Sequence, residues 1–238
     1  MTIPITQDFI PVGRRNRPGF SNPMNFITIH NTGNSNRGAN ARAHASYVRG
    51  DTAAGLPVSW HYTVDEDGAF QHLPDNETGW HAGDGNGPGN RQSIGIEICQ
   101  NSDGNLLKAT ENAVILTAIL CQRHNIAISN IRQHNHWSAK GCPQELRAGR
   151  PFTWAIFLAK VTEVLEVLQK PSTPPVQPTV PPTDKTPEEI TVEAAFELGI
   201  LGDKQHWVEV LRGTRTAVPE YVKRIMDNAI AEIRKRTQ

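Results

Sequence analysis

Near the middle of the chain the sequence reads SIGIEIC, from Ser93 to Cys99. Isoleucines occupy every second position of this stretch, and polar segments flank it on both sides. A period of two residues is typical of a β-strand, whose side chains point alternately to opposite faces. The pattern therefore predicts a strand that carries the Glu97 carboxylate on the face opposite Ile96 and Ile98.

Strand and helix patterns interleave around this stretch. A short strand is predicted from Phe26 into His30, and the turn signal DEDG at 65–68 predicts a hairpin. The glycine-rich segment 79–90 predicts a flexible loop without regular structure. Together the patterns predict an α/β fold in which helices cover a central mixed sheet. The other predicted elements are a strand at 131–137 and helices at 38–49, 110–125 (with Thr110 as its cap) and 152–168.

Composition excludes several classes of protein. The 238 residues include 24 Lys and Arg and 24 Asp and Glu, so the formal net charge is zero. A chain held on nucleic acid by a basic surface is therefore not expected. No apolar run approaches the roughly 18 residues that a membrane-spanning helix needs, so membrane insertion is not expected either. The first residues lack the pattern of a secretory signal, and we expect synthesis in the cytoplasm.

The placement of proline divides the chain. Seven of the 17 prolines lie at 171–187, a segment of a composition that cannot bury a core and that favours an extended spacer. Three stretches with helical periodicity follow, and the last begins at Pro219 and carries one apolar stripe. The sequence therefore predicts a first domain at 1–170, a Pro/Thr-rich linker at 171–187 and a small three-helix domain at 188–238.

Histidine and cysteine are the candidates for a metal site. Three cysteines are too few, and odd in number, for a disulfide framework. His134 and Cys142 lie close in sequence, and His30 ends the first predicted strand. Imidazole and thiolate are the usual zinc ligands, and a catalytic zinc keeps one position open for water. Spacing alone leaves open a histidine-rich surface with a buried thiol, and His136 is a rival to His134.

Glu97 is the candidate general base. If its face of the strand points towards the metal, its carboxylate is placed to take a proton from a zinc-bound water. A solvent-exposed polar position in a half-buried strand fits the same alternation, and the pattern alone does not decide between the two.

Five motifs in a fixed order carry a resemblance to a known family. They are ITIHNT at 27–32, SWHY at 59–62, GWHAGD at 79–84, SIGIE at 93–97 and HNHWSAKGCP at 134–143. With these motifs the chain resembles the zinc-dependent N-acetylmuramoyl-L-alanine amidases of the type 2 amidase or peptidoglycan-recognition fold. The resemblance covers about residues 3–168 and is greatest to endolysins of phages that infect Gram-positive bacilli.

The resemblance implies a role for five residues. His30, His134 and Cys142 would bind one zinc ion per chain, with water in the fourth position. Glu97 would be the general base, and Lys140 would stabilise the oxyanion on the attacked carbonyl. The bond implied joins the lactyl group of N-acetylmuramic acid to the L-alanine of the stem peptide, so the implied function is a peptidoglycan hydrolase that lyses the cell wall.

Four more residues are implied to contact the glycan or the peptide: Trp60, His61, Trp80 and His81. Trp60 stands where some relatives carry a catalytic tyrosine, which leaves more of the proton transfer to Glu97. For His61, a packed histidine that orients its neighbours by hydrogen bonds is the alternative.

The remaining histidines and cysteines of the first domain have no motif. His44, His72 and His124 are expected at the surface. Cys99 and Cys121 lie in apolar patterns and are expected to be packed thiols.

The predicted C-terminal domain carries no comparable motif. Its place after an amidase and a linker is similar to that of an endolysin unit that binds a cell-wall polymer, which raises the effective concentration at an insoluble substrate. We predict sugar contacts by His206, Trp207 and Tyr221, although Trp207 and Tyr221 fit a small core equally well. Dimerisation through the amphipathic helix is a second alternative.

The resemblance also implies a cellular context. Release from the host cytoplasm to the wall would need a membrane-permeabilising partner of the holin type. Two other functions fit the same fold, namely a cytosolic amidase that recycles muropeptides and a non-catalytic peptidoglycan receptor. A receptor is expected to lack the thiol ligand, so Cys142, Glu97 and Lys140 count against it. A proline-rich linker with an added domain fits a recycling amidase poorly.

Overall fold

The structure is a computed structural model that describes residues 2–170 together with Gln205 and Trp207. The predicted linker at 171–187 lies outside the described residues, as do His206 and Tyr221. Trp207 is half-buried. The three-helix domain and its wall contacts therefore stay predictions.

Within the described part of the chain, six strands form one sheet. Their order is β1-β4-β3-β5-β2-β6, and neighbouring strands are parallel except β3 and β4, which form the predicted antiparallel hairpin. The predicted central mixed sheet is thereby confirmed. The strands are β1 (Ile5–Gln7), β2 (Phe26–Asn31), β3 (Tyr62–Val64), β4 (Ala69–Gln71), β5 (Ser93–Ile98) and β6 (Ile131–Gln133).

The SIGIEIC stretch forms β5 in the middle of the sheet. Its three isoleucines are completely buried, and β2 lies beside it with Ile27 and Ile29 buried in the same way. The alternate positions of the two strands carry His30 and Glu97, which are register partners. The period of two therefore separates an apolar face from a face that carries functional groups, as the sequence predicted.

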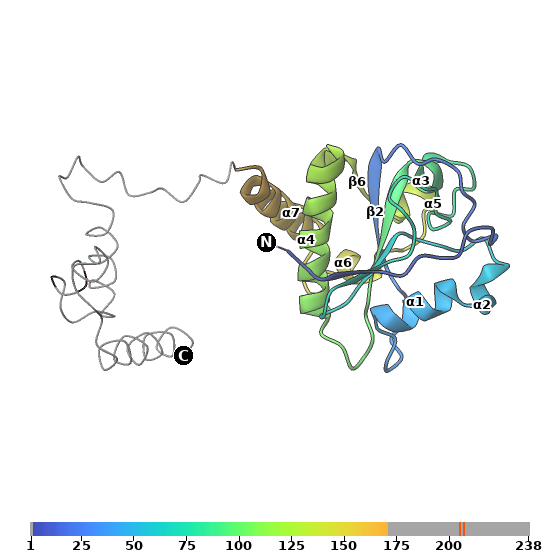
Figure 1. The fold of residues 1–238 in the computed structure, drawn as a ribbon, viewed down its shortest axis with the longest axis horizontal. Helices are drawn as coiled ribbons and strands as arrows, with labels where there is room; N and C mark the ends of the chain where they lie inside the picture. The colour runs from blue at the N-terminus through green and yellow to red at the C-terminus, as the bar shows by residue number, and fades with distance from the viewer. Residues whose placement is uncertain (1, 171–204, 206, 208–238) are drawn as a thin grey trace. The chain divides into compact units, whose positions relative to one another are not determined.

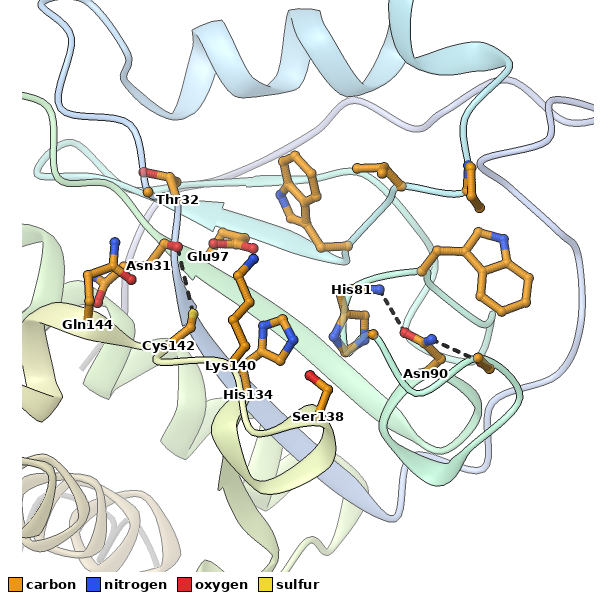
Figure 2. Close-up of a pocket in the computed structure, with 17 residues that line it drawn as sticks. Asn31, Thr32, His81, Asn90, Glu97, His134, Ser138, Lys140, Cys142 and Gln144 are labelled. Carbon is orange, nitrogen blue, oxygen red and sulfur yellow. Dashed lines mark hydrogen bonds between the residues drawn. The ribbon is translucent and has the colours of Figure 1, made fainter.

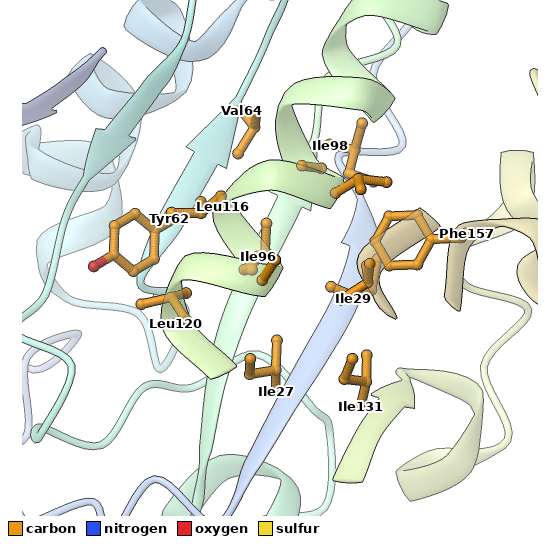
Figure 3. Close-up of a cluster of buried hydrophobic side chains, with 14 of the residues drawn as sticks. Ile27, Ile29, Tyr62, Val64, Ile96, Ile98, Leu116, Leu120, Ile131 and Phe157 are labelled. Atoms are coloured by element: carbon orange, nitrogen blue, oxygen red, sulfur yellow. The ribbon is translucent and has the colours of Figure 1, made fainter. Parts of the chain in front are cut away.

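Two long helices cover the isoleucine face of the sheet (Figure 1). They are α4 (Leu106–His124) and α7 (Trp154–Gln169), which pack against each other. Figure 3 shows the core between helices and sheet, where Leu116 and Phe157 have no exposed surface. Burial of a large apolar side chain contributes about 1.5–3 kcal/mol. This layer covers the isoleucine face of the sheet, and the site lies on the opposite face.

A shorter pair of helices lies on the other side of the sheet (Figure 1). α1 (Ala41–Arg49) packs against β3 and β4 and ends before Gly50, as predicted, and α2 (Asp51–Ala54) follows. A second apolar cluster joins α1 to the sheet and consists of Val48, Ile10, Trp60 and Leu73.

α4 begins at Leu106, one turn earlier than predicted. Asn105 is its cap, because the Asn105 side chain accepts a hydrogen bond from the Lys108 N–H at 3.0 Å. The predicted cap, Thr110, instead donates its hydroxyl to the Leu106 carbonyl inside the helix. Asparagine and threonine are both good caps, and sequence alone did not distinguish the two.

The strand predicted at 131–137 ends at Gln133, and α5 (Asn135–Ser138) follows it. Trp137 explains the difference. Its indole N–H donates to Thr28 Oγ1 at 2.9 Å, and its ring meets the Phe26 ring edge-on at 5.3 Å. These contacts with β2 are tertiary, so the local pattern did not reveal them.

Several short elements were not predicted. They are β1, α3 (Pro88–Arg91), α6 (Gln144–Arg147) and a 3-10 turn, η1 (Ile128–Asn130). These four elements are too short to show a period, and no turn signal marks them as the DEDG turn marks β3 and β4. Among the described helices, none has both the length and the apolar character to cross a membrane.

Candidate metal centre

A cavity opens on the face of the sheet opposite α4 and α7. Its volume is about 920 Å³, within the range of roughly 300–1,000 Å³ that is usual for ligand sites. Glu97 of β5 lies in its lining, together with His134, Lys140 and Cys142 on one side and His81 on the other (Figure 2). Residues far apart in the sequence therefore meet at one surface.

His134 and Cys142, which line this cavity, meet His30 directly behind the lining. Their possible ligand atoms all lie within 4.8 Å of one another, and all three residues are buried. His30 Nδ1 lies 2.9 Å from His134 Nδ1 and 3.8 Å from Cys142 Sγ. β2 and β6 are parallel neighbours, so the His30 end of β2 and His134, just after β6, lie at the same edge.

The turn of α5 brings Cys142 back to the two histidines. Ala139 ends this turn in the left-handed conformation, with φ of 59°. The Asn135 N–H donates to the Cys142 carbonyl at 3.0 Å, which closes the loop. The side chain of Cys142 then lies next to the end of β2, with Sγ 3.9 Å from the Asn31 carbonyl oxygen.

The three side chains fit a zinc ion. A tetrahedral zinc with bonds of about 2.0 Å to nitrogen and 2.3 Å to sulfur separates its ligand atoms by roughly 3.3–3.6 Å. The distances of 2.9 and 3.8 Å lie on either side of that range. The donors are also of the type that zinc prefers, and only three come from the protein, as in catalytic sites.

The protonation of the cluster favours a metal. Burial lowers the pKa of His30 far below its ordinary value, with His81, His134 and Lys140 acting in the same direction, and burial also lowers the pKa of His134. Both imidazoles are therefore neutral, which is the state that ligates metals. Burial and the nearby Glu97 raise the pKa of Cys142 to about 12. Metal binding would displace the thiol proton.

Glu97 lies next to the cluster. Its Oε1 is 3.8 Å from His30 Nδ1, and its Oε2 is buried without a hydrogen-bond partner among the described residues. Burial raises the pKa of Glu97 to about 8, against the opposing charge of Lys140. A carboxyl group in this range can accept and release a proton near neutral pH.

Lys140 supplies positive charge to the same cavity. Figure 2 shows its amine directed towards Glu97, and the Lys140 charge lowers the pKa of that carboxyl group. The side chain is exposed, so it reaches the cavity from the solvent side. A cation here can stabilise negative charge that develops on a substrate oxygen.

Three of the four predicted substrate residues line the cavity: Trp60, Trp80 and His81. A smaller hollow of about 380 Å³ along α1 shares Trp60 with it. The structure does not place His61 in the lining. His61 is completely buried; its Nε2 bonds the Glu77 carbonyl at 2.8 Å, and its Nδ1 accepts the Gly95 N–H at 3.0 Å. This is the packed histidine of the alternative prediction.

His136, His44 and His72 are not part of the cluster. His136 is exposed on α5 beside the Trp137 ring and is not part of the metal-binding group. The predicted surface positions of His44 and His72 are wrong, because both are buried. His72 Nε2 lies 2.8 Å from Thr63 Oγ1, and His44 bonds the Asn40 carbonyl at 2.9 Å.

His124, Cys99 and Cys121 also lie outside the metal-binding group. His124 is half-buried, with Nε2 2.7 Å from Asp75 Oδ2, so it is not a free surface residue. Cys99 and Cys121 are buried, which confirms that they are packed thiols. Burial raises the pKa of both thiols.

Sequence reasoning missed the roles of Asn90, which lines the cavity, and of Gly95, which lies against the His81 ring. Asn90 lies in the segment predicted as a flexible loop, but its Oδ1 accepts the N–H groups of His81 and Ala82, both at 2.7 Å. That segment also contains the start of α3, contrary to the prediction. Gly95 lies in the middle of β5, and a glycine inside a strand is a signal for close approach of another group.

Solved structures share this architecture. The structure of the catalytic domain of XlyA is 52% identical to this chain, with a TM-score of 0.62 over 67% of this chain and 99% of that one. The structure of PlyL is 36% identical, with a TM-score of 0.59 over 67% of this chain and 97% of that one. The described domain therefore has the fold of an amidase or endolysin catalytic domain.

Comparison of sequences gives the family. The family model for N-acetylmuramoyl-L-alanine amidase matches residues 20–145, and the chain belongs to this family. Two amidases of Bacillus subtilis (strain 168) are similar to it. XlyA is 52% identical over 66% of this chain and 50% of its own length, and CwlH is 49% identical over 60% and 57%. The alignments cover little more than half of these relatives.

Glu97 makes the metal-free protein less stable as pH rises. The folded state raises the pKa of Glu97 from its ordinary 4.5 to about 8. Between these values the folded state binds more protons than the unfolded state, so the free energy of unfolding falls with rising pH. Glu97→Gln mimics the protonated form. It should be more stable than the wild type by at least about 1 kcal/mol at pH 9, with no gain at pH 4.

Denaturant unfolding in the presence of a chelator at both pH values measures this difference. Glu163→Gln, on the exposed side of α7, is the matched control and should leave the free energy of unfolding nearly unchanged. An equal gain for Glu97→Gln at pH 4 and pH 9 would contradict the assignment of a raised pKa.

Proposed function

We propose that the protein is a zinc-dependent N-acetylmuramoyl-L-alanine amidase of the phage endolysin type. It hydrolyses the amide between N-acetylmuramic acid and the L-alanine of the stem peptide in the walls of Gram-positive bacteria. The observation that carries the proposal is the buried group of His30, His134 and Cys142, with Glu97 beside it in an open cavity. The family and the names of the similar Bacillus amidases support the bond chosen.

The zinc ion would be held by His30, His134 and Cys142. When bound, it supplies a Lewis acid that makes a water nucleophilic near neutral pH. Glu97 accepts the proton of the attacking water and returns it to the leaving nitrogen of L-alanine. Lys140 places its positive charge next to the oxygen of the attacked carbonyl, where negative charge develops.

The cavity wall would orient the substrate. Trp60 and Trp80 present aromatic surface beside the polar groups of the cavity. Such surfaces suit the apolar faces of sugars and the side chains of a peptide. Fixing the amide in the cavity removes orientational freedom before the reaction, which lowers the barrier.

The proposal extends to partners and place of action. We infer that the enzyme is made in the host cytoplasm, reaches the wall after a holin-type protein permeabilises the membrane, and binds a wall polymer through residues 188–238. Dimerisation through that region remains the alternative role. These inferences rest on the order of the segments and on the endolysin resemblance, since the structure describes only Gln205 and Trp207 of this region.

The zinc ligands can be tested by metal content. The wild type should bind about one zinc ion per chain, and Cys142→Ser should lose zinc affinity because a thiolate is replaced by a weakly acidic hydroxyl. His136→Ala is the matched control, since it removes the rival histidine without touching the cluster. Atomic absorption and chelator competition give the stoichiometry and affinity. Full affinity in Cys142→Ser, or its loss in His136→Ala, would refute the ligand set.

The bond cut can be identified by mass spectrometry of digested walls. New free amino groups on L-alanine, without new reducing sugars, are the expected products. Glu97→Ala should keep its zinc and lose about 10²-fold or more in turnover, as for removal of a general base. Activity confined to soluble anhydro-muropeptides would instead favour the recycling amidase, and binding without cleavage would favour the receptor.

The role of residues 171–238 can be tested with a fragment that ends at Lys170. The fragment should retain hydrolysis of soluble substrate, because the whole cavity lies before that residue. It should sediment less with intact walls and lyse them more slowly than the full chain. Equal wall binding and lysis by fragment and full chain would remove wall targeting from the proposal.

A further inference from the structure

His81 lines the cavity and also contacts His30, a candidate zinc ligand. Its Nδ1 lies 3.0 Å from His30 Nε2, and the two rings meet edge-on at 5.1 Å between centroids. His81 is 9% exposed and His30 is completely buried. The contact is therefore shielded from water.

Metal binding through His30 Nδ1 would determine which ring nitrogen of His30 and of His81 carries a proton. His30 uses Nδ1 in the cluster, since this atom faces His134 Nδ1 and Cys142 Sγ. A neutral imidazole that ligates through Nδ1 carries its proton on Nε2. The His30 Nε2–H then donates to His81 Nδ1, and His81 carries its own proton on Nε2.

We propose that His81 is a positioning residue for the metal centre, which orients His30 and fixes its tautomer by accepting this hydrogen bond. The inference rests on the zinc site of the proposed function. Groups that bind the outer nitrogen of a ligating histidine hold the ring in place and raise its basicity. His81 has this position relative to His30. His30 is the histidine of the cluster that contacts His81, whereas His134 interacts with the backbone of Ala82.

Three contacts keep His81 in place. The Asn90 side chain accepts its backbone N–H at 2.7 Å. The ring packs on Gly95, where a Cβ atom would lie 2.8 Å from the ring atoms Cγ and Cδ2 of His81. The His61 ring meets it edge-on at 5.8 Å and also accepts the Gly95 N–H. A side chain fixed from three directions suits the orientation of a ligand better than adjustment to a substrate.

A pair of variants separates the hydrogen bond from the packing. In His81→Asn, the amide Oδ1 takes the place of Nδ1 and can still accept from His30. His81→Leu has nearly the same shape as the asparagine but no acceptor. His81→Leu should lose roughly 10- to 100-fold in zinc affinity, and His81→Asn should stay within about threefold of the wild type.

Zinc affinity is measured by chelator competition on the full chain, and cobalt substitution reports the geometry of the site. In His81→Leu, the visible bands of bound cobalt should shift or weaken, while His81→Asn keeps the wild-type spectrum. His72→Asn is the matched control, because His72 is equally buried and bonds Thr63 instead of a ligand. Its zinc affinity should equal that of the wild type.

Each outcome has a distinct meaning. Equal zinc affinities in the wild type, His81→Leu and His81→Asn would overturn the inference. Equal losses of zinc affinity in the two variants would also overturn it, because packing alone would then explain the effect. Nitrogen-resolved NMR of the zinc-loaded wild type gives a test without substitution: His30 should be protonated on Nε2, and protonation on Nδ1 would overturn the inference. If the wild type binds no zinc, the proposed function fails instead.

Discussion

The parallel pairing of β2 with β5 is the constraint on which the rest of the domain depends. Its register places His30 opposite Glu97, and the alternation of side chains then puts every isoleucine of both strands on the other face. A slip of one residue in β5 would bury the Glu97 carboxylate against α4 and α7, and a slip in β2 would bury His30 there. In either case the isoleucines of the slipped strand would turn to the opposite face. The hydrophobic core therefore also sets the geometry of the candidate site.

Burial of the cluster determines its chemistry as well as its stability. Burial lowers the pKa of His30 and His134, so their imidazoles are neutral and able to ligate a metal. Burial also raises the pKa of Glu97 and Cys142, because both would have to carry negative charge in an apolar setting. A divalent cation would relieve both penalties. We interpret the centre as a site whose electrostatics are balanced only when a metal is bound.

Local patterns predicted much of this fold and less of the site's surroundings. Alternation gave the strands that carry His30 and Glu97, because a period of two is visible in sequence. The end of β6 depends on the contact of Trp137 with Thr28, a pairing distant in the chain that no local pattern contains. The family resemblance grouped the candidate ligands and placed His81 in the cavity. It did not reveal the contact of His81 with His30, because the order of motifs does not show which ring nitrogens meet.

Gly95 shows how the strand and the site constrain each other. A glycine inside a strand lowers β-sheet stability, and replacing it by a β-branched residue is an ordinary way to make a protein more robust. Here any side chain at that position would enter the space of the His81 ring. Attempts to improve the thermal tolerance of this domain should leave Gly95 unchanged, because the missing side chain provides the space for His81 beside the candidate metal centre.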